Sequence, residues 1–290
     1  MVLLRSLIAA AILTQTALAL TPVGHTPSGA PIYEAPFGSR VLQVGRDMKV
    51  FAPNGTVIHT FANAVPQSST SAPIRRQVLS DAAASVQLTN TSDLLESLNT
   101  TIVVPPPPTT FNSQLMWVAG SIKIPGNDGV PFASLRAVLQ YGATAIQGGP
   151  FWTIAAQLEL LPDGGLLQIS RPGFDPTVSA GTSISTSVVH TDEGDGVFWY
   201  IAAFDNIPGS SNIQVGFQMP ASGAVIGMEE EGVFQSSEYP AEPLTFANTS
   251  LKLTSGFPDI MWDTSSDSVS GAYVTVDKDG SEDAEITIHF

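Results

Sequence analysis

The chain has 290 residues, a net charge of −15 at neutral pH and no cysteine. The excess of carboxylates excludes nucleic acid as the main partner, because phosphates would be repelled rather than neutralised. The lack of cysteine excludes thiol catalysis, disulfide pairing and a cysteine-ligated metal.

The first residues have the three-part pattern of a secretory signal. Arg5 precedes an apolar run that ends in small residues at Ala17 and Ala19, and the run is too short to span a bilayer. No later stretch approaches a membrane-spanning length. We therefore predict a signal peptide over residues 1–19, cleavage after Ala19, and a secreted, extracellular protein with no membrane partner.

The segment that follows, residues 20–76, differs from the rest in charge. Residues 1–76 carry six cations and two acids, whereas residues 77–290 carry five cations and 24 acids. The junction is rich in Ala, Ser and Pro and ends in Arg75-Arg76, which is typical of an exposed cleavage site. We predict that residues 20–76 (the leader) are a basic propeptide with a linker, which docks on the acidic body, residues 77–290, and is released at low pH. The alternative is an ordinary N-terminal extension.

Four Asn-x-Ser/Thr sequons are expected glycosylation sites on surface loops of a secreted protein. They begin at Asn54, Asn90, Asn99 and Asn248.

Short apolar or alternating runs dominate the body and are separated by Gly, Pro and Asp-Gly. This spacing predicts an all-β fold, a concanavalin A-like β-sandwich (jelly roll) of antiparallel strands. The best stretch for a helix is Asp81 to Leu98, although helical periodicity is scarce. Strands are predicted over 101–104, 115–119, 135–140, 152–160, 166–170, 184–189, 198–202, 213–217 and 251–253, with a terminal hairpin over 272–276 and 285–289.

Three segments in the middle of the body combine polar groups with a strand pattern. They are Val138-Leu-Gln-Tyr-Gly142, Ala156-Gln-Leu-Glu-Leu-Leu-Pro-Asp163 and Met228-Glu-Glu-Glu231. In this order they resemble motifs of the fungal glutamic peptidases (eqolisins). Those motifs are a strand with Leu-Gln-x-Gly, an aromatic segment that ends in Pro-Asp, and a later strand with a catalytic glutamate followed by further acids. The resemblance covers about residues 100–290.

A looser resemblance links the chain to secreted concanavalin A-like proteins of fungi and bacteria. It is carried by Val104-Pro-Pro-Pro-Pro108, Val138-Leu-Gln-Tyr-Gly142 and Gly148-Gly-Pro-Phe-Trp152. This resemblance implies a β-sandwich without implying catalysis.

The resemblance to glutamic peptidases implies how a site on this chain would act. A glutamate takes a proton from water as general base, and a glutamine donates to the tetrahedral oxyanion. Here the catalytic residues would be Glu229 and Gln140, with Trp152, Glu159 and Glu231 as substrate-binding neighbours.

Alternation along a strand would place Glu229 and Glu231 on one face and Glu230 on the other. Glu230 and Glu231 would form a crowded carboxylate environment around Glu229, and Glu231 remains an alternative base. The aromatic run of the family is replaced here by Gln157 and three leucines, so its substrate-binding rings are missing. The alternatives to a catalytic pair are a hydrogen-bonded core glutamine at Gln140 and a solvated acidic turn at residues 229–231.

Other patterns for metal or catalytic sites are missing from the sequence. The four histidines form no HExxH pair, and the acids of residues 277–283 lack the twelve-residue calcium pattern. No Gly-x-Ser-x-Gly elbow is present. We expect no metal and no cofactor.

The leading hypothesis is an acid-acting, glutamic-peptidase-like hydrolase made as a zymogen. A carbohydrate-binding protein and a catalytically inactive protein of the cell wall are the alternatives without catalysis. A glycosidase would use Glu159 and Glu229, with facing carboxyl groups about 5 to 9 Å apart. The expected partners are a polypeptide or polysaccharide substrate and the basic propeptide itself. Convergence of Gln140 and Glu229 in one open groove would favour the peptidase.

Overall fold

The computed structural model describes most of the chain from residue 19 onward. The predicted signal peptide up to residue 18, the Arg75-Arg76 pair and the Asn90 sequon lie outside the described residues. Within the described part, no helix is long and apolar enough to cross a membrane. The described ranges are 19–66, 82–88, 93–142, 148–161, 165–192, 194–266 and 271–290.

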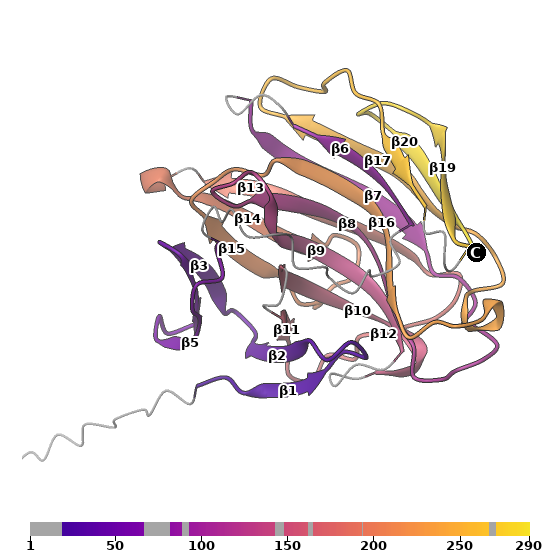
Figure 1. Cartoon of the computed structure of the whole chain (residues 1–290), viewed down its shortest axis with the longest axis horizontal. Coiled ribbons are helices and arrows are strands. Elements are labelled where there is room, and N and C mark those ends of the chain that lie inside the picture. Colours follow the sequence, from indigo (N-terminus) through magenta and orange to yellow (C-terminus); the bar gives the residue numbers. More distant parts are fainter. Residues whose placement is uncertain are drawn as a thin grey trace, which may run out of the picture.

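Two sheets face each other across one hydrophobic core (Figure 1). The first, sheet A, contains the longest strands of the molecule at its centre. Its strands lie side by side in the order β1 (Pro22–His25), β2 (Pro31–Pro36), β11 (Gly165–Ser170), β10 (Gly149–Leu160), β9 (Pro131–Gly142), β8 (Leu115–Pro125), β16 (Gly223–Glu231), β6 (Ala82–Gln87) and β18 (Asp263–Ser265), and β12 (Thr177–Val178) pairs with β10.

The second sheet, sheet B, includes both the C-terminal hairpin and three strands of the leader. Its order is β19 (Tyr273–Lys278), β20 (Ala284–His289), β17 (Leu244–Leu253), β7 (Leu95–Val103), β13 (Ser183–Asp192), β14 (Phe198–Phe204), β15 (Ile213–Phe217), β3 (Arg40–Val44), β4 (Asp47–Phe51) and β5 (Val57–Phe61). Two short 3-10 helices complete the described secondary structure, η1 (Gly194–Gly196) and η2 (Ser236–Glu238).

The predicted all-β sandwich is confirmed, and so is the terminal hairpin, which is β19 and β20. The stretch from Asp81 to Leu98 that best fitted a helix is wrong as a helix, because β6 and the start of β7 lie within it. Alanine has a strong helix propensity, but the three alanines of β6 find ladder partners in β16 and β18. Tertiary pairing therefore overrides local propensity here.

The strands of the leader belong to both sheets. Strand β2 pairs in parallel with β11 at the edge of sheet A, and β3 pairs in parallel with β15 at the edge of sheet B. These are the two parallel pairings among the described strands, and all the others are antiparallel. Residues 37–39 join β2 to β3, so the leader crosses from one sheet to the other along one side of the sandwich, drawn in indigo in Figure 1.

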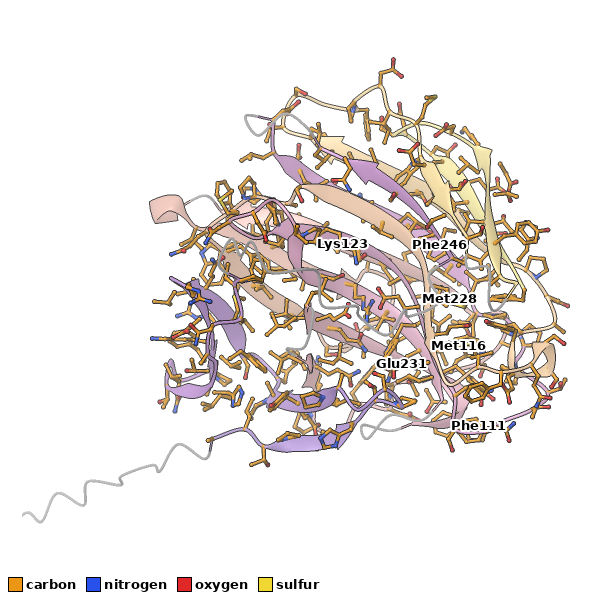
Figure 2. All side chains as sticks on the ribbon, viewed as in Figure 1. Phe111, Met116, Lys123, Met228, Glu231 and Phe246 are labelled. Atoms are coloured by element: carbon orange, nitrogen blue, oxygen red, sulfur yellow. The ribbon has the colours of Figure 1, made fainter. Side chains whose placement is uncertain are left out.

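The central strands of sheet A are buried on both faces. One face carries the apolar side chains of the core, among them Met116 and Met228, which pack in one cluster with Phe246 of sheet B (Figure 2). The other face, here called the polar face, carries side chains with hydrogen-bonding groups or charge in rows that are separated by an apolar row at Val138. Its members include Trp117, Lys123, Arg136, Gln140, Gln157, Glu159, Gln168, Glu229 and Glu231.

Gly142 ends the Leu-Gln-Tyr-Gly motif in a backbone conformation that only glycine adopts without strain. Its φ is +107°, and a Cβ atom would lie 1.8 Å from the carbonyl oxygen of Gln114. We expect Gly142→Ala to lower the free energy of unfolding by at least about 3 kcal/mol, because it adds a backbone clash to positive-φ strain.

The matched control for this substitution is Gly173→Ala, in urea unfolding of both variants. Gly173 also has a positive φ, +76°, but a Cβ there meets nothing within 4 Å. We expect a loss of about 1 kcal/mol at Gly173, which is the strain alone. Equal losses of unfolding free energy at Gly142 and Gly173 would show that the short distance to the Gln114 carbonyl does not affect stability.

Candidate active site

Gln140 and Glu229 lie in one row across sheet A. Gln140 of β9 pairs with Trp117 of β8, and Trp117 pairs with Glu229 of β16. Residues directly opposite one another in a ladder point to the same face, so both side chains lie on the polar face. Their Cα atoms are two strand spacings apart, about 10 Å.

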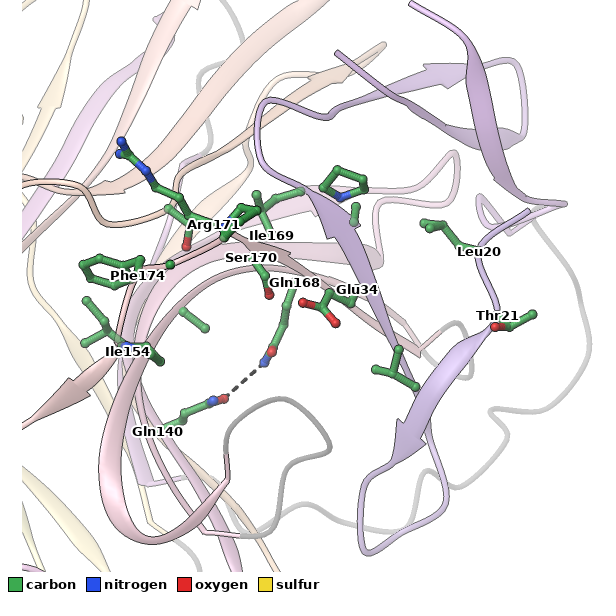
Figure 3. Close-up of a pocket in the computed structure, with 18 of the residues that line it drawn as sticks. Leu20, Thr21, Glu34, Gln140, Ile154, Gln168, Ile169, Ser170, Arg171 and Phe174 are labelled. Carbon is green, nitrogen blue, oxygen red and sulfur yellow. Dashed lines mark hydrogen bonds between the residues drawn. The ribbon is translucent and has the colours of Figure 1, made fainter. Parts of the chain in front are cut away.

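Gln140 is the centre of a buried group of glutamines. Its side chain is 2% exposed, and its Oε1 accepts hydrogen bonds from Nε2 of Gln157 and Nε2 of Gln168, both at 3.1 Å. Figure 3 shows the bond from Gln168 beside Glu34 of β2. Gln140 borders a hollow of about 690 Å³, whose wall includes Leu20 and other residues of the leader.

Glu229 is held by cations. Its Oε2 accepts a hydrogen bond of 2.6 Å from Nη1 of Arg136, and its Oε1 lies 3.9 Å from Nζ of Lys123. Glu229 borders a second hollow of about 370 Å³, lined also by Trp117, Lys123 and Arg136. The polar face therefore brings Gln140 and Glu229 to the same side of the sheet, but each borders its own hollow, with Trp117 between them in the row.

Arg136 is a residue of this candidate site that the sequence did not single out. Its side chain is 3% exposed, its Nε donates to Oε1 of Gln157 at 3.2 Å, and its Cζ lies 5.5 Å from the ring centroid of Trp117. A usable signal was present, because an arginine inside an apolar strand is rarely buried without a partner. The partner Glu229 lies 93 residues away in the sequence.

Glu159 approaches the same guanidinium group. Its Oε2 is 3.7 Å from Nη1 of Arg136, so this oxygen and Oε2 of Glu229 lie within about 6 Å of each other. This separation is near the range of glycosidase carboxylates, but such a pair needs one protonated member as general acid. The same buried guanidinium nitrogen of Arg136 contacts both carboxylates, so the geometry disfavours a glycosidase.

The three consecutive glutamates separate as alternation requires. Glu229 and Glu231 pair with Trp117 and Leu115 on the polar face, whereas Glu230 points the other way and is buried. Oε2 of Glu231 accepts a 2.6 Å hydrogen bond from the backbone N–H of Ser28, in the turn between β1 and β2. The charged groups in contact with Glu229 include two cations, which differs from the crowded carboxylate environment expected from the sequence.

Trp152 does not lie on the polar face. It pairs with Tyr141, their ring centroids are 5.2 Å apart, and the indole is 2% exposed within the core. The neighbouring residue Thr153 pairs with Gln140 and takes the polar-face position. The predicted role of Trp152 as a substrate-binding residue is therefore corrected, because its ring fills the space between the sheets.

The described processing and glycosylation positions lie in different environments. Ala19 is exposed, as are Asn54 in the turn between β4 and β5 and Asn248 in β17. Asn99 lies in β7, where its Nδ2 donates to the hydroxyl groups of Ser97 and Ser250, both at 3.3 Å. A glycan at Asn99 would have to displace these two hydrogen bonds.

The acids near the C-terminal hairpin are engaged by protein groups. Oδ1 of Asp279 accepts the backbone N–H groups of Trp262 and Gly280, and Oδ2 of Asp277 accepts the hydroxyl of Thr287. In the described part of the chain, no three His, Asp or Glu side chains are grouped closely enough to hold a metal ion.

Glu238, just beyond β16, has a structural role. Its carboxylate accepts hydrogen bonds from the backbone N–H groups of Phe234 and Gln235 and from the side chain of Asn112. The bond from the Phe234 N–H is the largest cause that lowers the pKa of Glu238 below its usual value. The carboxylate therefore holds the turn after the Glu229 strand in its ionised form, and this support is lost only as the pH falls through the lowered pKa.

Comparison with known proteins gives a likeness at the level of architecture. No protein-family model matches the chain, and no curated protein matches it. Scytalido-glutamic peptidase bound to a peptide-based transition state analog aligns with a TM-score of 0.48 and 14% identity over 73% of this chain and 98% of that chain. SCP-B, a member of the eqolisin family of peptidases in complex with the tripeptide Ala-Ile-His, gives 0.47 and 14% over the same shares. Identity this low assigns no residue roles.

Proposed function

We propose that the protein is a secreted, acid-acting hydrolase of peptide bonds, of the glutamic-peptidase type and made as a zymogen. The observation that carries the proposal is the single row that joins Gln140 to Glu229 on the polar face of sheet A. The motif order in the sequence supports the same pair.

In the proposed reaction, Glu229 takes a proton from a water molecule while the water oxygen attacks the peptide carbonyl carbon. The Nε2 group of Gln140 donates to the oxyanion that forms. The proton then passes from Glu229 to the amide nitrogen, the C–N bond breaks, and a carboxylic acid and an amine leave. The carbonyl would have to lie above Trp117, between the two hollows, so the reaction requires Glu229 to turn from Arg136 towards the substrate.

The position of the leader supports a zymogen. Leu20, Thr21, Val23 and residues 34–36 lie among the walls of the hollow beside Gln140. The turn that contains Ser28 is bound to Glu231, two residues from Glu229. A substrate that reached Gln140 would occupy the space beside these segments. Release of the leader would therefore open the site.

The test is hydrolysis of a denatured protein substrate between pH 2 and pH 7, by secreted protein before and after acid incubation. We expect activity below pH 5 that appears as the leader is lost. Glu229→Gln should reduce kcat by about 10²- to 10⁴-fold and Gln140→Ala by about 10²- to 10³-fold. The matched control is Glu285→Gln, an exposed glutamate of β20, which should keep full activity. Wild-type protein without its leader that hydrolyses nothing would refute the proposal.

A second function is favoured by one specific observation. Glu229 forms a 2.6 Å ion pair with Arg136, which is suited to holding a charge in place rather than to proton transfer. A non-catalytic protein that binds polysaccharide would keep this pair intact. Binding of the inactive, leader-free protein to a glycan array would favour this function over the peptidase.

A further inference from the structure

The buried side chain of Arg136 links the two residues of the proposed catalytic pair. Its Nη1 contacts the carboxylate of Glu229 at 2.6 Å. Its Nε contacts the amide oxygen of Gln157 at 3.2 Å, and Gln157 in turn contacts Gln140. One side chain thus touches Glu229 directly and reaches Gln140 through one intermediate.

Chemistry fixes which group donates and which accepts in the hydrogen bonds that run from Arg136 through Gln157 to Gln140. A guanidinium group only donates, so the atom of Gln157 that faces Arg136 must be its oxygen. The amide nitrogen of Gln157 must then face Gln140, and Gln140 must present its oxygen to receive the bond. Gln168 donates to the same oxygen at 3.1 Å.

The consequence is the orientation of the Gln140 amide. Both bonds that it accepts fall on Oε1, and its Nε2 has no acceptor among the described residues. The group left to meet a ligand is therefore an N–H donor, as an oxyanion requires. If Gln157 were free to turn over, its oxygen would face Gln140, and the N–H groups of Gln140 would be used inside the protein.

We propose that Arg136 is a positioning residue, which acts through Gln157 to keep the amide nitrogen of Gln140 available to a ligand. This inference rests on the proposed function for its catalytic meaning. The orientation of Gln140 itself is a physical property that is measured without any turnover.

The decisive variant is Gln157→Glu, because it keeps the shape and still accepts from Arg136. An ionised carboxylate cannot donate to Gln140, so the amide of Gln140 is expected to turn and donate to position 157. Once protonated, the new carboxyl group can again donate to Oε1 of Gln140. Arg136→Lys is the companion variant, since it keeps a cation near Glu229 but removes the Nε donor.

The first readout is the side-chain amide signal of Gln140 in ¹H–¹⁵N spectra of the full chain. We expect Gln157→Glu to shift this signal and slow its hydrogen exchange near neutral pH, with return towards the wild-type position on acidification. Arg136→Lys should also shift it. The control Lys252→Gln, on an exposed ion pair of sheet B, should leave it unchanged. An unchanged Gln140 signal in Gln157→Glu would overturn the inference.

The second readout is the pH profile of hydrolysis after release of the leader. For Gln157→Glu we expect kcat to fall about 100-fold at the upper end of the active range, with KM little changed, and to recover as the pH is lowered. A merely structural role would lower activity at every pH. If the wild type hydrolyses nothing, the proposed function fails, and the amide signals alone decide the inference.

Discussion

Replacement of Arg136 by methionine is expected to lower the free energy of unfolding at neutral pH by about 3 to 5 kcal/mol. The guanidinium group is 3% exposed and contacts Glu229 and Glu159, whose side chains are 17% and 11% exposed. Methionine keeps much of the volume but leaves two carboxylates of the polar face without this cation. The energetic cost is that of uncompensated charge rather than lost packing. Chemical denaturation at pH 7 measures it.

A comparison with an exposed ion pair identifies the cause of this loss. The control is Lys252→Met, which breaks an ion pair with Glu96 in which both side chains are at least 40% exposed, and should cost less than about 1 kcal/mol. A loss at Arg136 no larger than the loss at Lys252 would show that burial of the cation adds nothing to stability.

Most of the strands were predictable because the body alternates apolar and polar residues over short runs. Two parts of the chain were interpreted differently from what forms. The stretch from Asp81 to Leu98 contains helix-favouring alanines whose ladder partners are distant in sequence. In the leader no strand was predicted, although apolar and polar residues alternate in Arg40–Val44 and Asp47–Phe51. Both runs flank Gly45, and β3 and β4 pair as neighbouring antiparallel strands.

The candidate site was predictable only in part, because register between distant strands has no local signal. Motif order suggested Gln140 and Glu229, but only the pairing of both with Trp117 puts them in one row. The alternation of side chains along β10 would have been enough to correct the prediction for Trp152. Within β10, residues of odd number point to the polar face, so Trp152 and Glu159 must point in opposite directions.

Cleavage at the predicted Arg75-Arg76 site is expected, by itself, to leave the leader bound at neutral pH. Strands β2 and β3 extend the two sheets by backbone hydrogen bonds. The leader also contributes fully buried side chains, including Ile32, Val41 and Met48. Its removal would expose these contacts and two sheet edges, β11 and β15, which are costly to leave unpaired. Size-exclusion chromatography of protein nicked by a trypsin-like protease should therefore show one species at pH 7.

Glu231 is expected to help hold the nicked leader at pH 7, whereas release of the leader by acid remains a prediction of the charge difference between leader and body. Glu231 accepts the backbone N–H of Ser28 at 2.6 Å, and a charged acceptor roughly doubles the strength of such a bond. No ion pair joins a described leader cation to a described carboxylate of the body, so this bond is the best-defined charged contact between the leader and the body. Glu231→Gln should therefore loosen the nicked leader at pH 7, whereas Glu242→Gln, at an exposed loop position, should not. If the leader separates from the body at pH 7 immediately after nicking, the strand pairings of β2 and β3 do not retain it. If leader and body still elute together at pH 3, acid is not the trigger for release.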